Sequence, residues 1–144
     1  MSPLKYRICT WIFQGICLGL IFLFAFSSYE KLIGIDRFER DLSKISLIGA
    51  FAPVVAWLVP LLEMGIVVLL IIPSTLKVGL YAFTCTMVLF TAYIAAMMAW
   101  EDNLPCSCNI LLEKLSWPQH IWFNLGVIAF SVLALWLHKK IKIL

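Results

Sequence analysis

Residues 52–72 read APVVAWLVPLLEMGIVVLLII, a run that contains a single ionisable side chain, Glu63. A helix needs about 20 consecutive apolar residues to cross the hydrocarbon core of a bilayer. Inside lipid, such a run satisfies its backbone hydrogen bonds internally only when it is helical. This stretch therefore predicts a membrane-spanning helix, and it decides the class of the protein.

Three further apolar runs lie on either side of it. Residues 8–27, 79–100 and 119–137 are each long enough, or nearly so, to cross the bilayer. The short turn Pro73-Ser74-Thr75 separates the second run from the third, which makes those two helices antiparallel neighbours. The predicted fold is all-α, an integral membrane four-helix bundle that forms one domain over residues 1–144.

The composition of the whole chain supports a membrane protein. Of its 144 residues, 63% are hydrophobic and only 13% are charged, with a mean hydropathy of +1.01. A soluble domain of this length cannot bury so much apolar surface. The net charge of +3 comes without the clustered basic and aromatic pattern of a nucleic-acid-binding protein. The expected partner is the lipid bilayer, with no nucleic acid.

The distribution of basic residues predicts the orientation. With four crossings, both termini and the Pro73 turn lie on one side of the membrane. That side carries six basic residues and no acidic residue: Lys5, Arg7, Lys77, Lys139, Lys140 and Lys142. The other side carries five, spread over two longer loops: Lys31, Arg37, Arg40, Lys44 and Lys114. Because positive charge concentrates in cytoplasmic segments, both termini are expected to be cytoplasmic.

The first run is longer than the 7–15 residues of a signal-peptide core and is expected to remain as an anchor.

The segment between the first two spans is amphipathic. Ile35, Phe38, Leu42 and Ile45 recur at helical spacing, whereas charged residues occupy the other face. A segment of this kind lies at the membrane interface or caps the bundle. It is either a solvated connector or a docking surface for a partner.

The second outer loop contains Leu104-Pro105-Cys106-Ser107-Cys108-Asn109. Two cysteines on the oxidising side of a membrane suit thiol–disulfide chemistry. A bridge between positions i and i+2 closes a small ring and meets the preferred disulfide geometry only with strain. Strained disulfides are more oxidising and more labile than structural ones.

Two alternatives stay open for this pair. Cys106 and Cys108 can be inert or structural thiols, or they can bind a metal together with His120. The remaining cysteines, Cys9, Cys17 and Cys85, fall inside predicted spans, where a thiol behaves as a small apolar side chain.

Glu63 is the second candidate site residue. An ionisable group near the middle of a membrane span is costly and indicates function by default. We expect it to be neutral and hydrogen-bonded, with Thr86, Thr91 and Ser131 at comparable depth as candidate partners. Its role is either structural or that of a proton relay or quinone contact.

The chain resembles the MauE/DoxX group of small redox-associated membrane proteins. The resemblance is carried by Tyr29-Glu30-Lys31-Leu32, Pro60-Leu61-Leu62-Glu63 and Pro105-Cys106-Ser107-Cys108, and Asn124 matches a frequent position. Members often have Cys-Gly-Cys-Phe-Gly and a later Arg-Asn, where this chain has Cys-Ser-Cys-Asn and Phe123-Asn124. The resemblance implies a bacterial inner-membrane protein that supports disulfide chemistry or cofactor maturation outside the cytoplasm. Some relatives work with thioredoxin-like partners, and others belong to quinone-reducing complexes.

Two functions follow as hypotheses. In the first, the protein is a thiol–disulfide oxidoreductase or electron relay. It exchanges electrons between Cys106/Cys108 and an extracytoplasmic thioredoxin-like protein, with a quinone near Glu63 as the candidate electron sink. In the second, it is a non-catalytic subunit of a larger cell-envelope complex, and its outer loops contact other membrane subunits.

Overall fold

The computed structural model describes residues 2–100 and 116–143, and this part of the chain is helical, with no strand. The helices are α1 (Pro3–Ile33), α2 (Ile35–Ser43), α3 (Ala52–Ile71), α4 (Leu76–Trp100) and α5 (Trp117–Ile143), with one 3-10 turn at Gly49–Phe51. Four of the helices are long and apolar enough to cross a membrane. The predicted all-α membrane bundle is confirmed, and the protein is multi-pass.

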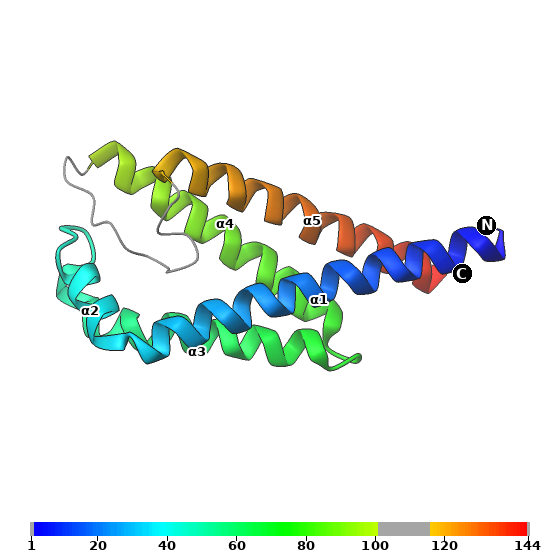
Figure 1. Cartoon of the computed structure of the whole chain (residues 1–144), viewed down its shortest axis with the longest axis horizontal. Coiled ribbons are helices and arrows are strands. Elements are labelled where there is room, and N and C mark those ends of the chain that lie inside the picture. The colour runs from blue at the N-terminus through cyan, green and yellow to red at the C-terminus, as the bar shows by residue number, and fades with distance from the viewer. Residues whose placement is uncertain (1, 101–115, 144) are drawn as a thin grey trace.

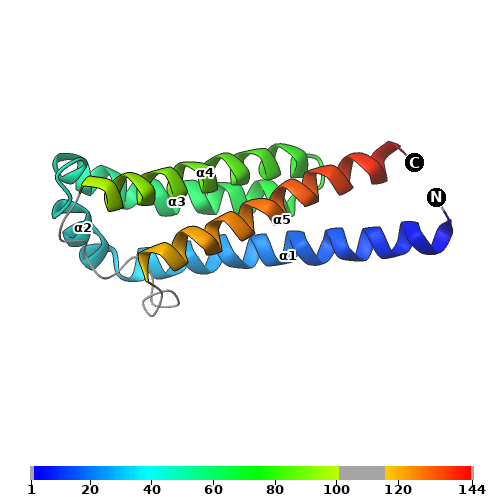
Figure 2. The ribbon, with the colours of Figure 1, turned by 90° about the horizontal axis from the view of Figure 1, so that it is seen from above.

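The four long helices form a ring (Figures 1 and 2). Helix α1 packs against α3 and α5, and α4 packs against the same two helices, so α1 and α4 lie diagonally opposite each other. The N- and C-termini lie together at one end of the bundle, and α2 lies at the other end (Figure 1). The ring therefore has a termini end and an α2 end.

Helix α1 is longer than the predicted span at both ends. It begins at Pro3, where proline costs no helical hydrogen bond, and the Ser2 side chain caps it by accepting from the Lys5 amide at 3.4 Å. At the other end α1 continues six residues past the predicted limit of Ser27 and stops at Gly34, whose amide bonds to the Glu30 carbonyl at 3.0 Å. This extension carries Lys31 into the bundle.

The turn between α3 and α4 is tight, as predicted. The Thr75 hydroxyl donates to the Leu69 carbonyl at 3.0 Å and so closes the end of α3. Gly79 follows one turn into α4 and touches the α3 backbone, since a Cβ atom there would lie 2.9 Å from the carbonyl carbon of Leu69. The small residue permits the close approach of the two helices.

An aromatic pair fills the centre of the ring. Phe24 of α1 and Phe83 of α4 reach across the diagonal, with ring centroids 4.1 Å apart, and both are almost fully buried. Apolar side chains from all four long helices surround the pair, including Leu20, Ile66, Leu70, Leu80, Met87 and Ala134. This cluster is the main core of the bundle.

Helix α2 caps the α2 end. Its Leu42, and Ile45 just after it, are buried against Ala52 and Ala56 of α3 and Met97 of α4. Asp36, Arg37 and Arg40 are exposed on the other side of the helix, as its amphipathic pattern requires, whereas Asp41 lies beside Leu42 with its side chain only 14% exposed. Of the two placements expected for this segment, the structure therefore has the cap.

Candidate functional site

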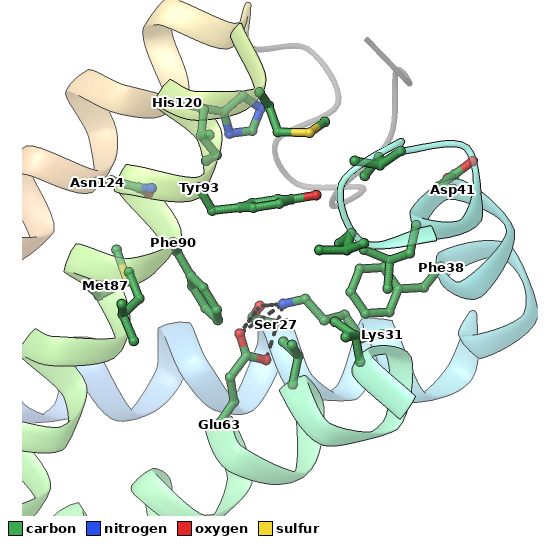
Figure 3. Close-up of a pocket in the computed structure, with 18 of the residues that line it drawn as sticks. Ser27, Lys31, Phe38, Asp41, Glu63, Met87, Phe90, Tyr93, His120 and Asn124 are labelled. Atoms are coloured by element: carbon green, nitrogen blue, oxygen red, sulfur yellow. Dashed lines mark hydrogen bonds and ion pairs between the residues drawn. The ribbon is translucent and has the colours of Figure 1, made fainter. Parts of the chain in front are cut away.

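Glu63 lies inside the bundle with three hydrogen bonds to its carboxyl group. Its side chain is 1% exposed. The Lys31 ammonium donates to both carboxyl oxygens, at 2.9 Å to Oε1 and 3.2 Å to Oε2, and the Ser27 hydroxyl donates to Oε1 at 3.2 Å. Lys31 also donates to Ser27 Oγ, which closes a cluster of three side chains from α1 and α3 (Figure 3).

The pair is a buried ion pair. The Lys31 side chain is only 12% exposed, and the rings of Phe38 and Phe90 lie 6.0 Å from its ammonium nitrogen. Burial disfavours each charge separately, and the ammonium at 2.9 Å offsets part of that cost for the carboxylate. That Glu63 is hydrogen-bonded agrees with the expectation, and its neutral state stays a prediction.

The partners of Glu63 differ from those expected. Thr91 donates instead to the Met87 carbonyl of its own helix at 2.7 Å. Ser131 donates to the Ile128 carbonyl at 2.8 Å and accepts from Thr84 at 3.0 Å. The reason is the length of α1. Its last turns run beside α3, so Lys31 and Ser27 contact Glu63 in place of the hydroxyl groups of α4 and α5.

A second contact fixes the level of α1 against α3. The Ser28 hydroxyl, fully buried, donates to the Pro60 carbonyl at 2.8 Å. Pro60 has no N–H and so leaves the Ala56 carbonyl of α3 without its helical donor, whereas Ser28 binds the carbonyl of Pro60 itself, one turn further along α3. Ser27 and Ser28 thus meet Glu63 and Pro60 at one level of the bundle.

A cavity of about 370 Å³ opens beside this cluster. Residues from all five helices line it, and most of the lining is apolar and aromatic, including Phe24, Phe38, Phe90, Tyr93 and Trp117. The polar side chains in the lining come from different helices: Ser27, Lys31, Asp41, Glu63, Tyr93, His120 and Asn124. A few polar groups in an apolar concavity are typical of a small-molecule site.

Asn124 is a polar group of this lining with no hydrogen bond to its carboxamide in the described part of the chain. The residue is 8% exposed and stands on α5, in the wall of the cavity (Figure 3). Buried amides are normally hydrogen-bonded, since an unmade bond costs free energy. The carboxamide is therefore available to a molecule in the cavity.

The two candidate cysteines, Cys106 and Cys108, lie outside the described residues. The helix ends on either side of them are described, and Met97 of α4 and Trp117 of α5 both line the cavity. His120, the third ligand of the metal alternative, also lines it. Over residues 2–100 and 116–143, no cluster of three side chains is arranged to hold a metal ion. The other cysteines lie in α1 and α4, where Cys17 is buried and Cys85 is exposed.

The family model for the methylamine utilisation protein MauE matches residues 9–137. The chain belongs to the MauE family. The matched range runs from within α1 to within α5 and includes every candidate site residue. It confirms the MauE part of the resemblance stated from sequence. No curated protein and no solved structure matches this MauE chain.

Two members of the site were missed from sequence. Ser27 and Lys31 were placed at the end of the first span and in the outer loop. The sequence contains a signal for Lys31. A carboxyl group within a membrane span requires a partner, and Lys31 is the basic residue closest in sequence to the outer end of a predicted span.

Proposed function

We propose that this MauE-family protein supports thiol–disulfide chemistry outside the cytoplasm, with Cys106 and Cys108 as its redox pair. It is a bacterial inner-membrane protein with cytoplasmic termini. A thioredoxin-like domain is the exchange partner, and maturation of an extracytoplasmic protein or its cofactor is the outcome. The observation that carries the proposal is the Cys-Ser-Cys sequence between α4 and α5, two helices whose adjoining ends line a cavity.

The charge distribution supports the orientation. The basic residues of the predicted cytoplasmic side belong to the termini end, on the first turns of α1, the start of α4 and the last turns of α5. Lys31, which counted against this orientation, pairs with Glu63 within the bundle. Without Lys31, four basic residues remain on the predicted outer side, against six on the predicted cytoplasmic side. The difference in positive charge between the two sides is then larger.

The chemistry is an exchange between sulfur atoms. A thiolate of the pair attacks a disulfide of the partner, releases one partner thiolate and forms a mixed disulfide. The second thiolate of the pair then attacks the sulfur of the first cysteine and displaces the other partner thiolate. The partner is reduced to two thiols, and a Cys106–Cys108 bond forms. In the opposite direction the same bond oxidises the partner, and the direction depends on the two reduction potentials.

Alkylation across a graded redox buffer tests the proposal. In a protein whose Cys9, Cys17 and Cys85 are replaced by Ala, mass spectrometry should show Cys106 and Cys108 losing two hydrogens together. The potential should be more oxidising than the roughly −300 mV below which structural disulfides fall. Cys106→Ser or Cys108→Ser should abolish the transition. Two unreactive thiols under oxidising conditions, or a stoichiometric metal, would contradict the proposal.

The scaffold alternative gives a different result in cells. For a relay, Cys108→Ser should trap a mixed disulfide through Cys106 with an extracytoplasmic protein, and a matched Cys85→Ser variant should trap none. If both loop cysteines can be replaced without loss of function while the membrane assembly stays intact, the protein is a structural subunit.

A membrane-impermeant thiol reagent tests the orientation. It should label Cys106 or Cys108 in intact spheroplasts, and labelling only after lysis would reverse the orientation.

A further inference from the structure

The termini end of the bundle carries positive charge and no acidic side chain. Its basic residues stand on three helices, and they are Lys5, Arg7, Lys77, Lys139, Lys140 and Lys142. Residues 2–29, 64–100 and 116–143, which include this whole end, contain no Asp or Glu. In the described part of the chain, none of the six side chains pairs with a carboxylate. Their counter-charge therefore comes from the surroundings of the protein.

These basic groups converge around His138 of α5. The ring of His138 lies 5.7 Å from that of Phe13 of α1, measured between centroids. The ammonium groups of Lys142 and Lys77 are both near enough to act electrostatically on His138. The end of α5 and the start of α4 thus bring positive charge to one place beside α1. Because like charges repel, an anion placed between Lys77 and Lys142 would stabilise both.

Aromatic side chains indicate the depth of this place in the membrane. Trp136 is exposed on α5, and the Lys140 ammonium nitrogen lies 3.8 Å from its ring centroid. Trp11 is exposed on α1, two residues before Phe13. Tryptophan is enriched at the boundary between acyl chains and headgroups, and lysines near helix ends extend toward that boundary. The basic groups therefore lie at the level of the lipid phosphates.

The surface next to the lysines, toward the middle of the bundle, is apolar. Helix α4 exposes Val78 and Tyr81 directly after Lys77, and α5 exposes Leu133 and Trp136 before its lysines. The termini themselves extend past the turn at which α4 begins (Figures 1 and 2). A ligand that fits this arrangement has an anionic head and an apolar tail.

From this arrangement we infer that the termini end binds an anionic glycerophospholipid. Its phosphate group is held between Lys77 of α4 and Lys142 of α5, and its acyl chains lie along the apolar surfaces of these two helices. Basic groups between membrane helices on the cytoplasmic side are suited to such headgroups. A soluble anion would meet the lysines but would leave the apolar surface unused. The inference depends neither on the thiol chemistry nor on the cavity at the α2 end.

Native mass spectrometry of the full chain, stripped of lipid in a non-ionic detergent, tests the inference. The protein is titrated with dioleoyl-phosphatidylglycerol or with dioleoyl-phosphatidylcholine, which has the same acyl chains and no net charge. We expect the anionic lipid to bind more tightly at the first site. One lysine at the membrane surface contributes about fivefold in affinity. Lys77→Gln and Lys142→Gln should each weaken binding of the anionic lipid by that factor, and together by about 25-fold.

Two double variants serve as controls for charge and for place. Arg40→Gln with Lys44→Gln removes two exposed positive charges from the α2 end and should leave binding unchanged. Lys77→Arg with Lys142→Arg keeps both charges in place and should bind the anionic lipid as the wild type does. Equal affinity for the two lipids would overturn the inference. An equal loss of binding in the Gln variants of the two ends would also overturn it, because net charge alone would then explain the effect.

The source of the phosphate group is tested by competition. Glycerol 3-phosphate carries the same anionic group without acyl chains, and an equal concentration should not displace the lipid. Displacement would show a site for soluble anions and would contradict the lipid assignment. The protein with Cys106→Ser and Cys108→Ser should bind the anionic lipid as the wild type does. A failure of the thiol chemistry therefore leaves the lipid site standing, and the absence of lipid binding leaves the thiol proposal untouched.

Discussion

The two ends of the bundle are built from the same helices but differ in kind. From the Phe24–Phe83 pair at the centre toward the termini end, the helices form a continuous apolar core, with hydroxyl contacts such as Thr84 to Ser131 between helices. Phe24 also borders the cavity on its other side. Toward the α2 end, the helices enclose a cavity and a buried ion pair. Dense packing supplies stability and a hollow polar site supplies chemistry, so we assign function to the α2 end.

The largest expected loss of stability follows from removing one partner of the ion pair. Lys31→Met leaves the Glu63 carboxylate buried without its counter-ion, and losing one partner of such a pair costs about 3–5 kcal/mol. The free energy of unfolding, measured by SDS titration and helical circular dichroism, should fall by that amount. Adding Glu63→Leu should restore most of the loss, because replacing both partners is often neutral.

An exposed lysine gives the matched control. Lys44 pairs with Asp41 at 3.1 Å, but its side chain is 64% exposed. Lys44→Met should change the free energy of unfolding by less than about 1 kcal/mol. A Lys31→Met protein as stable as Lys44→Met would show that the buried pair does not hold the α2 end together.

The second test addresses the packing at the termini end. Gly79→Ala places a Cβ atom 2.9 Å from the α3 backbone, closer than such atoms approach, and the backbone cannot move aside cheaply. Overpacking of this kind costs about 1–3 kcal/mol in the free energy of unfolding. Gly65→Ala is the control, because its Cβ atom meets no atom within 4 Å. Equal stability of the two variants would contradict the tight α3–α4 contact.

The smallest expected effect concerns the hydroxyl contact between α4 and α5. Thr84→Val removes the 3.0 Å bond to Ser131, together with the 2.8 Å bond to the Leu80 carbonyl of its own helix, and keeps the shape of the side chain. Bonds of this kind between membrane helices contribute about 0.6 kcal/mol on average. Thr10→Val, which removes only a bond to the Tyr6 carbonyl one turn earlier on the exposed start of α1, should cost less. A loss of several kcal/mol for Thr84→Val would mean that polar contacts, rather than apolar packing, stabilise this end.

Most of the fold was predictable because each span is specified locally. The runs around Glu63 and on either side of the Pro73 turn contain their own length and hydropathy signals, and the helices lie where those signals place them. The helix ends were less predictable. Helix α1 continues through Lys31 because that charge finds a partner on α3, a contact that hydropathy along one segment does not encode.

The candidate site was predictable only in part. Glu63 stands out in sequence because a carboxyl group is costly inside a membrane span. Its partners depend on the position of α1 along α3, and the buried hydrogen bond from Ser28 to the Pro60 carbonyl helps to fix that position. The cavity is a further step away, since it arises where five helices meet around Phe90 and Asn124.

The end of α1 at Gly34 also sets how far the ion pair lies from the α2 end of the bundle. From Ser27 to the last residue of α1, Ile33, there are six residues, or about 9 Å at 1.5 Å per residue. Helix α2 begins directly afterwards, at Ile35. Although Glu63 is near the middle of α3 in sequence, its partner Lys31 belongs to the last turn of α1. The buried pair therefore joins the middle of one spanning helix to the end of another, and a displacement of α2 would be felt at the pair within two helical turns of α1.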